Sequence, residues 1–277
     1  MLCDSTASRF PCSKTIVADS CSIVENKISS ALIMEDDSDW DVNLKAQMIE
    51  FARGTRILQG DKSGGSSSGS PYGDDWDMLW LGHCGMKSLQ EERGEQPAFY
   101  IIPNDTTVRP PQHKMDFVNP RLAESPGFED HRLVFTGEGP ICSWSLAFTY
   151  DGARKALTAL SMVGVDQPVD LGYNFLCSGN LGFPIRCFST YPSLMGTWTQ
   201  QGPTSRNSDI VESDVVDWHD ASSQTMVYST MLNMMALANN STKIRAQWEE
   251  ARQAEIDLAT FEIPSGFLYF PDSDSEP

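Results

Sequence analysis

Short runs of apolar residues recur along the chain at intervals that predict buried strands. These runs are "ALIM" (31–34), "WDMLWLG" (76–82), "AFYIIP" (98–103), "RLVFTG" (132–137) and "IRCFSTYP" (185–192). Between them, residues 15–28, 42–58 and the later part of 142–164 carry apolar side chains at helical spacing. Strands and helices therefore alternate to about residue 190. This alternation predicts an α/β domain with a mixed, mostly parallel sheet.

The two longer helical segments each predict one buried face. The face of the first is formed by Leu44, Met48, Phe51 and Ala52, and the face of the second by Ala153, Leu157 and Leu160. Residues 61–75 read as a flexible Gly/Ser insertion between the first helix and the next strand. The alternation of strands and helices continues after this insertion.

The pattern divides the chain into three parts. Residues 1–14 carry no periodic pattern and are expected to be unstructured, whereas 15–215 form the main domain. Beyond residue 205 the pattern loosens, and 216–277 form a C-terminal segment in which 224–257 have room for one helix. The acidic end "PDSDSEP" is expected to remain disordered.

Charge narrows the classes of partner. The chain has 20 basic and 38 acidic side chains and a formal net charge of −18, with no basic stripe. Phosphate contacts need clusters of Lys and Arg, so this balance opposes binding to nucleic acid or to an anionic membrane. No window has the apolar length of a membrane span, and the N-terminal residues lack a signal-peptide core. The sequence does not determine the cellular compartment. Entry to the secretory pathway is possible if N-terminal residues are missing. The N-glycosylation sequons at Asn104, Asn239 and Asn240 would be used only in that pathway.

Seven cysteines show no CxxC pair and no Cys/His spacing typical of zinc. Cys142, Cys177 and Cys187 lie in apolar surroundings, where a free thiol behaves as a small core residue. We therefore expect these three cysteines to be free and buried.

Five carboxylates follow the strand "ALIM" within seven positions: Glu35, Asp36, Asp37, Asp39 and Asp41. An EF-hand is excluded because Val42 stands at the required glycine and Met48 at the terminal glutamate. A structural interpretation has Asp39 or Asp41 capping the following helix. A functional one has the cluster at a strand tip holding a divalent ion, because ligands of open α/β sheets bind beyond the carboxyl ends of strands.

Several segments carry a resemblance to a known family. They are "SSALIMEDDSDWDVNLKAQM", "PYGDDWDMLWLGHCG", "CSWSLAFTYDGARKAL", "PVDLGYNFLCSG" and "YPSLMGTWTQQGPTSRNSDI". In this order and spacing, over about residues 20–215, they resemble the fungal branch of glycosyltransferase family 25, which is related to lipooligosaccharide and procollagen galactosyltransferases. The resemblance implies a GT-A-like nucleotide-sugar fold, a UDP-sugar donor (often galactose), a glycan or protein acceptor that the sequence does not name, and inverting transfer with Mn²⁺ or Mg²⁺.

The family's residues carry over at few positions. Glu35, Asp36 and Asp37 stand at its acidic metal-binding motif, and Asp170 stands at the aspartate of its Pro-Val-Asp segment. Two features depart from the family. Its first βα units need about 60 residues, whereas only residues 1–28 precede the acidic strand, so the fold is expected to be incomplete at the N-terminus. Thr197 and Trp198 stand where that family tends to have a pair of histidines. The alternative function is therefore a catalytically inactive, truncated remnant of the fold, either a binding protein or a non-functional paralogue.

Four further residues are candidates. Asp170 is a candidate general base for an acceptor hydroxyl or, equally, the N-cap of a helix, and Asp166 is a weaker candidate base. Trp198, in a polar loop, is a candidate for stacking on a sugar face. His83 is a weak candidate for lining the acceptor side, and a loop histidine with a structural hydrogen bond is the preferred interpretation.

Overall fold

The computed structural model describes residues 19–61, 69–88, 98–113, 117–118, 128–163, 168–183, 185–204 and 217–270. The predictions for residues 1–14, for Asp166 and for the acidic end after residue 270 lie outside these ranges. Within them, no helix is both long and apolar enough to cross a membrane.

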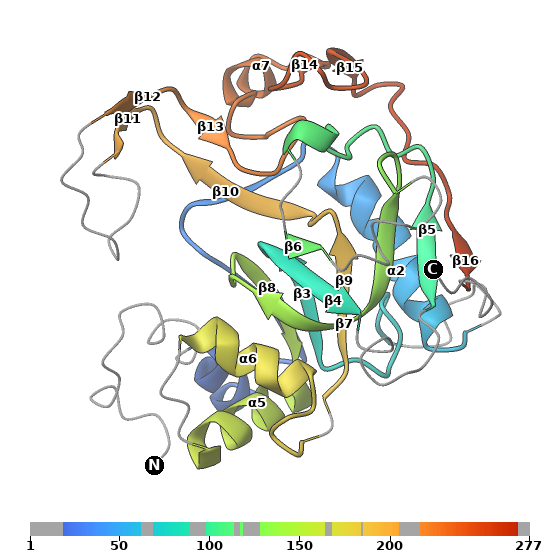
Figure 1. Ribbon diagram of the computed structural model, residues 1–277, viewed down its shortest axis with the longest axis vertical. Coiled ribbons are helices and arrows are strands. Elements are labelled where there is room, and N and C mark those ends of the chain that lie inside the picture. The colour runs from blue at the N-terminus through green and yellow to red at the C-terminus, as the bar shows by residue number, and fades with distance from the viewer. Residues whose placement is uncertain are drawn as a thin grey trace.

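In the described part of the chain, twelve strands form one large sheet (Figure 1). They are β1 (Ser30–Met34), β2 (Ser38–Trp40), β3 (Met78–Gly82), β4 (Gly85–Ser88), β5 (Phe99–Ile102), β6 (Phe117–Val118), β7 (Arg132–Ile141), β8 (Ser145–Thr149), β9 (Cys187–Tyr191), β10 (Met195–Thr199), β13 (Ser222–Ser223) and β16 (Phe267–Tyr269). Two small ladders pair β11 (Gly202–Pro203) with β12 (Trp218–His219) and β14 (Lys243–Arg245) with β15 (Glu255–Asp257). The helices are α2 (Leu44–Leu58), α5 (Tyr150–Val163), α6 (Val169–Cys177), α7 (Met234–Ala238), a 3₁₀ turn at Pro111–His113 and a first helix that includes residues 19–25.

The protein is α/β with a mixed sheet, but the expectation of mostly parallel strands is wrong. The central order is β1-β8-β3-β9-β7-β4-β6, and among the described strands only β3–β9, β3–β10 and β4–β6 are parallel pairs. The cause of the error is physical. A continuous apolar run indicates a strand covered on both faces, and antiparallel strands between two helical layers are covered in the same way.

Helices cover both faces of the sheet. Alternate residues of β3 point to opposite sides: Met78 and Trp80 pack in the core beneath α5 and α6, while Leu79 and Leu81 pack with Phe51 of α2. Figure 1 shows α5 and α6 together on one side and α2 on the other. The predicted inward face of α2 is confirmed, because Phe51 is buried and Leu44 and Met48 pack against the same core.

Two predicted elements differ in detail. On α5 the fully buried positions are Ala153, Ala156 and Ala159, while Leu157 is half-buried, so small residues let this helix lie close to the sheet. Among the described strands, β1 is hydrogen-bonded to β8 and to no other. Its residues alternate between exposed and half-buried, and Leu32 is 48 % exposed. The apolar run before the acidic residues is therefore an edge strand and not a fully buried one.

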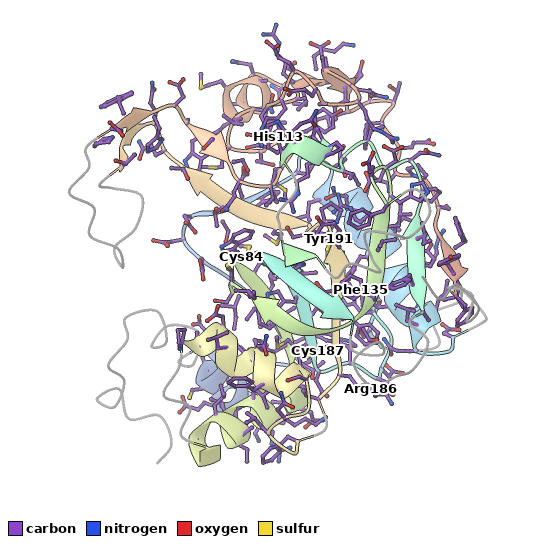
Figure 2. All side chains as sticks on the ribbon, in the orientation of Figure 1. Cys84, His113, Phe135, Arg186, Cys187 and Tyr191 are labelled. Atoms are coloured by element: carbon purple, nitrogen blue, oxygen red, sulfur yellow. A yellow bond between two sulfur atoms is a disulfide. The ribbon has the colours of Figure 1, made fainter. Side chains whose placement is uncertain are left out.

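The prediction that Cys142, Cys177 and Cys187 are free is wrong, whereas their expected burial is confirmed for Cys177 and Cys187. Disulfides join Cys84 to Cys142 and Cys177 to Cys187, with Cα–Cα distances of 5.5 and 5.7 Å, and Cys21 is also disulfide-bonded. Cys84 and Cys187, labelled in Figure 2, lie at the ends of different strands. Sequence spacing did not indicate these pairs, because bonding requires the folded chain to bring the two Cβ atoms together.

The C-terminal segment adds strands and a small core of its own. Residues 224–257 do not form the expected single helix: α7 has five residues, and β14 and β15 follow it. Val227, Tyr228, Ile244 and Ile256 form the buried centre of this part. The segment also joins the main sheet, where β13 pairs with β10 and β16 with β5.

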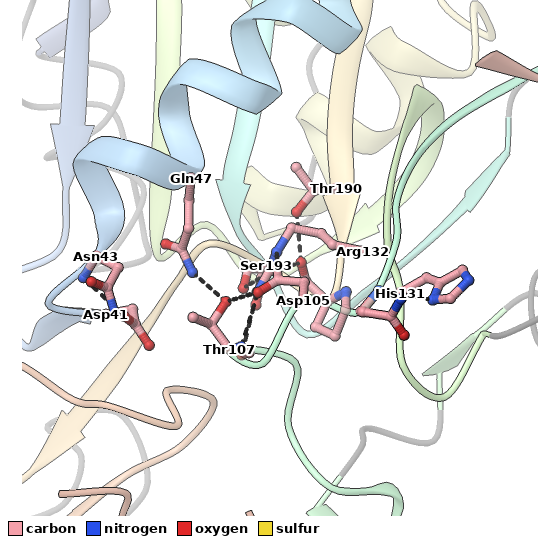
Figure 3. Close-up of polar contacts among 11 residues, drawn as sticks. Asp41, Asn43, Gln47, Asp105, Thr107, His131, Arg132, Thr190 and Ser193 are labelled. Carbon is pink, nitrogen blue, oxygen red and sulfur yellow. Dashed lines mark hydrogen bonds and ion pairs between the residues drawn. The ribbon is translucent and has the colours of Figure 1, made fainter. Parts of the chain in front are cut away.

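A buried ion pair ties the sheet to the loop before the 3₁₀ turn. The Arg132 Nε–H donates to Asp105 Oδ2 at 2.7 Å, and both side chains are almost fully buried. Arg132 also donates to Thr107 Oγ1 at 2.9 Å, and Gln47 of α2 donates to the same hydroxyl at 2.7 Å (Figure 3). Because every partner is hydrogen-bonded, this charge is tolerated in the core.

Candidate active site at the β1–β2 turn

The acidic residues begin where β1 ends. Glu35 follows Met34, whose antiparallel partner on β8 is Ser145. This register places Glu35 beside the loop that connects β7 to β8. The backbone N–H of Glu35 donates to the Trp144 carbonyl at 3.1 Å, and the hydroxyl of Ser143 donates to Glu35 Oε1 at 3.1 Å.

Asp170 reaches the same loop from the first turn of α6. Its Oδ2 atom accepts a hydrogen bond of 3.0 Å from the backbone N–H of Cys142. The residue at the N-cap of α6 is Pro168, with no side-chain cap, so the N-cap interpretation of Asp170 is wrong. The loop holds Asp170 through Cys142 and Glu35 through Ser143, and so brings together two carboxylates 135 positions apart in the sequence.

The loop between β7 and β8 is held in place by a disulfide and by backbone hydrogen bonds. Cys142 has a positive φ of 65° and is bonded to Cys84, and its carbonyl accepts a hydrogen bond of 2.9 Å from the Trp80 indole. The Cys84 N–H donates to the Ile141 carbonyl at 2.8 Å. These contacts fix the backbone that positions both acids. Apart from the cysteines themselves, no pattern in the sequence indicated them.

Trp198 lies on the other side of the acidic turn. Strand β10 pairs with β2, so that Thr197 opposes Ser38, and the Trp198 N–H donates to the Asp37 carbonyl at 2.6 Å. Trp198 is half-buried, so that part of the residue is accessible to solvent, and its backbone lies beside the acidic turn. Candidates from three separate stretches of sequence thus meet at the β1–β2 turn.

The electrostatics of the turn favour a cation. The pKa of Glu35 is raised, and burial is the largest cause. The hydrogen bond from Ser143 lowers the pKa, while the negative charges of Asp37, Asp36 and Asp170 raise it further. Burial and the charge of Asp36 likewise raise the pKa of Asp37. Carboxylates that repel one another in a partly desolvated place are stabilised by a positive ion.

Asp39 and Asp41 are directed elsewhere and are fully buried. Asp39 accepts hydrogen bonds from the Ser229 hydroxyl and from the Met231 N–H, the latter at 3.3 Å. Asp41 accepts from the Tyr228 N–H at 3.2 Å. The N-cap of α2 is Asn43, with no side-chain cap, so the expectation that Asp39 or Asp41 is the cap of this helix is wrong. Asp39 binds the C-terminal segment, and Asp41 binds both that segment and the backbone N–H of Asn43, the latter at 2.9 Å.

His83 does not join the site. Its ring is buried, and its Nε2 lies 2.8 Å from the Thr190 carbonyl, the structural hydrogen bond that the sequence favoured. Burial lowers the His83 pKa to about 4, and the nearby Arg109 charge lowers it as well. The ring is therefore neutral at physiological pH.

The metal hypothesis can be compared with the side-chain positions. Among the residues that the structure describes, no three His, Cys, Asp or Glu side chains already converge as a metal-binding group. The oxygen donors of Glu35, Asp36 and Asp37 are nevertheless of the type that Mg²⁺ and Mn²⁺ prefer. The turn supplies the charge and the donor atoms, and rotation of the exposed Asp36 and Asp37 side chains would be needed to gather them around an ion.

Comparison with known proteins adds no assignment. No protein-family model matches this chain, and no curated protein matches it.

Proposed function

We propose that this chain is a metal-dependent glycosyltransferase with a GT-A-like fold, which transfers a sugar from a UDP-sugar to an acceptor hydroxyl with inversion. The single observation that carries the proposal is the meeting of Glu35–Asp37, Asp170 and Trp198 around one turn. The resemblance to glycosyltransferase family 25 had selected Glu35–Asp37 and Asp170 from the sequence alone, whereas Trp198 departs from that family and was a candidate because of its polar loop. A metal-dependent inverting transfer needs a cation that is bound by carboxylates near the leaving group, a carboxylate that acts as general base, and a side chain on which the sugar can stack.

Glu35, Asp36 and Asp37 would hold the Mn²⁺ or Mg²⁺. When bound, the ion supplies positive charge to the diphosphate leaving group. The support is electrostatic: the pKa values of Glu35 and Asp37 are raised by burial and by neighbouring negative charges, and a cation relieves that repulsion.

Asp170 would take the proton of the acceptor hydroxyl. One of its oxygens is held by the Cys142 N–H at 3.0 Å, which orients the carboxylate. Within the described residues its other oxygen has no hydrogen bond, so it can accept one. The half-buried indole of Trp198 would stack on a sugar face, as aromatic rings do with the C–H groups of saccharides.

The test is ligand-dependent stability. Mn²⁺ with UDP should raise the melting temperature, because a ligand that binds only the native state adds RT ln(1 + [L]/Kd) to the free energy of unfolding. Asp37→Ala should abolish the increase. Glu262→Ala, which removes the same charge from an exposed position on the C-terminal segment, should retain it.

Two results would count against the proposal. An unchanged wild-type midpoint at millimolar Mn²⁺ and UDP would mean that donor binding is absent and that a non-catalytic remnant is the better description. An equal increase with Mn²⁺ alone in both variants would show nonspecific binding of metal to a chain of net charge −18.

We also propose that the protein folds in an oxidising compartment, in keeping with a secretory glycosyltransferase. Disulfides persist where thiols are not kept reduced, and this chain forms Cys84–Cys142 and, within the buried core, Cys177–Cys187. The sequon asparagines Asn104, Asn239 and Asn240 are all exposed. Glycosidase treatment of the protein from its native source should increase its electrophoretic mobility, and an unchanged mobility together with free thiols would contradict this proposal.

A further inference from the structure

A second candidate site lies at the opposite end of β1 from the acidic turn. A cleft of about 820 Å³ is bordered by Ser29 and Ser30, by residues 69–77 and by the first turns of α5. Ser30 pairs with Thr149 at this end of the β1–β8 ladder, and Met34 pairs with Ser145 at the other. Four strand residues span ~13 Å, so the cleft is separate from the Glu35–Asp37 turn.

The floor of the cleft is built around Asp77. Both carboxylate oxygens of Asp77 accept hydrogen bonds from Lys155 Nζ, at 2.8 and 2.7 Å, and one of them also accepts from the Arg186 N–H at 2.9 Å. The helix α5 approaches so closely that a Cβ on Gly152 would lie 2.1 Å from the Asp77 carbonyl oxygen. Only glycine allows this contact, so the floor is tightly packed and preformed.

The wall formed by residues 70–75 is also held in place. Although this stretch belongs to the Gly/Ser-rich insertion, Gln59 at the end of α2 binds it twice. The Gln59 Nε2–H donates to the Tyr72 carbonyl at 2.7 Å, and Gln59 Oε1 accepts from the Asp75 N–H at 2.9 Å. Gly73, between these two contacts, has a φ of 89°. A ligand would therefore meet a wall already arranged for binding, which lowers the entropic cost.

The charges in the cleft nearly cancel. Four aspartates line it, and three of them are paired: Asp77 with Lys155, Asp151 with Arg154 and Asp75 with Arg186, which Figure 2 labels. Asp74 is exposed and has no ion pair within the described residues. An anion would face four carboxylates, and the three bases are already paired with three of them. A neutral ligand rich in hydroxyl groups meets donors and acceptors without this repulsion.

Aromatic side chains complete the cleft. Tyr72, Tyr150 and Phe183 line it and are each partly exposed. Tyr72 is braced by an edge contact with Trp76, with ring centroids 5.8 Å apart. From the cavity, the balanced charge and these rings, we propose that the cleft binds a neutral oligosaccharide. The volume is in the range of clefts that take ligands of a few rings. This inference does not depend on the proposed transfer reaction.

The test is an array of neutral gluco-, galacto- and manno-oligosaccharides of two to six units, printed beside sulfated and sialylated oligosaccharides. We expect the full chain to bind at least one neutral member and to bind the anionic members more weakly. Titration with that neutral saccharide should then show that Tyr150→Ala weakens binding at least tenfold. Tyr150→Phe, which keeps the ring, should bind as the wild type does.

The outcomes separate this proposal from the transferase proposal. Asp37→Ala should bind the saccharide normally, and Tyr150→Ala should keep its thermal response to Mn²⁺ and UDP. The cleft proposal is overturned if no neutral oligosaccharide binds, if anionic ones bind best, or if Tyr150→Ala has no effect. Loss of saccharide binding in Asp37→Ala would also overturn it, because the ligand would then occupy the acidic turn.

Discussion

The two halves of the acidic run have opposite environments. Glu35, Asp36 and Asp37 face outward with at least partial exposure, whereas Asp39 and Asp41, two and four residues further on, are completely buried. The first three repel one another and lack a positive partner among the described residues. The last two are surrounded by donors from the C-terminal segment. The same residue types thus serve as a candidate binding site in one half and as a structural clamp in the other.

The comparison teaches that a cluster of carboxylates is best judged by the donors around each one. A buried carboxyl group that accepts hydrogen bonds from backbone and hydroxyl groups has its oxygens satisfied within the protein. A partly buried carboxylate beside other carboxylates does not, and it gains stability from an external cation. Substitution should therefore affect the two halves with opposite sign.

The largest expected effect is on the structural half. Asp39→Ala removes the acceptor for the Ser229 hydroxyl, which is fully buried, and for the Met231 N–H, which is partly buried. We expect it to lower the free energy of unfolding by roughly 4 kcal/mol, measured by urea denaturation. Asp36→Ala, at an exposed position in the same run, should change it by less than about 0.5 kcal/mol. Equal effects of the two substitutions would contradict the division into two halves.

A pH effect distinguishes the halves further. Burial raises the pKa of Asp41 to about 7, against the opposing hydrogen bonds from Asn43 and Tyr228. Above pH 4 the unfolded chain has released this proton while the folded chain keeps it, so the contribution of Asp41 to stability falls as pH rises from about 4 to 7.

The matched variant for this effect is Asp41→Asn, which cannot titrate. The difference in free energy of unfolding between wild type and variant should shrink by about 2 kcal/mol between pH 4.5 and 6.5. Urea denaturation at several pH values measures it. A difference that stays constant, or that grows with pH, would mean that Asp41 does not carry a raised pKa.

The smallest effect concerns the candidate site. Glu35→Gln keeps an acceptor for Ser143 and removes a negative charge that is repelled by Asp36, Asp37 and Asp170. We expect an increase in the free energy of unfolding at pH 7 of a few tenths to about 1 kcal/mol, since solvent screens part of the repulsion. The same variant should show a weaker response to Mn²⁺ and UDP. A loss of stability similar to that of Asp39→Ala would place Glu35 with the structural clamp.

Local patterns were enough to locate most elements. The apolar runs gave the positions of β1, β3, β5, β7 and β9, and helical spacing gave α2 and α5, because the period of side-chain exposure depends only on neighbouring residues. The same reasoning placed Glu35–Asp37 at the end of a strand. It failed in 224–257, where a small separate core overrides weak helical spacing.

Contacts between distant residues could not be predicted in this way. Strand direction, the disulfides, the burial of Asp39 and Asp41, and the meeting of Asp170 with Glu35 each depend on which segments the fold places side by side. A carboxylate has the same sequence signature whether its donors lie in water or in a segment 190 positions away. The chain therefore encodes its elements locally, while partners, charge compensation and the geometry of both candidate sites arise only when those elements pack.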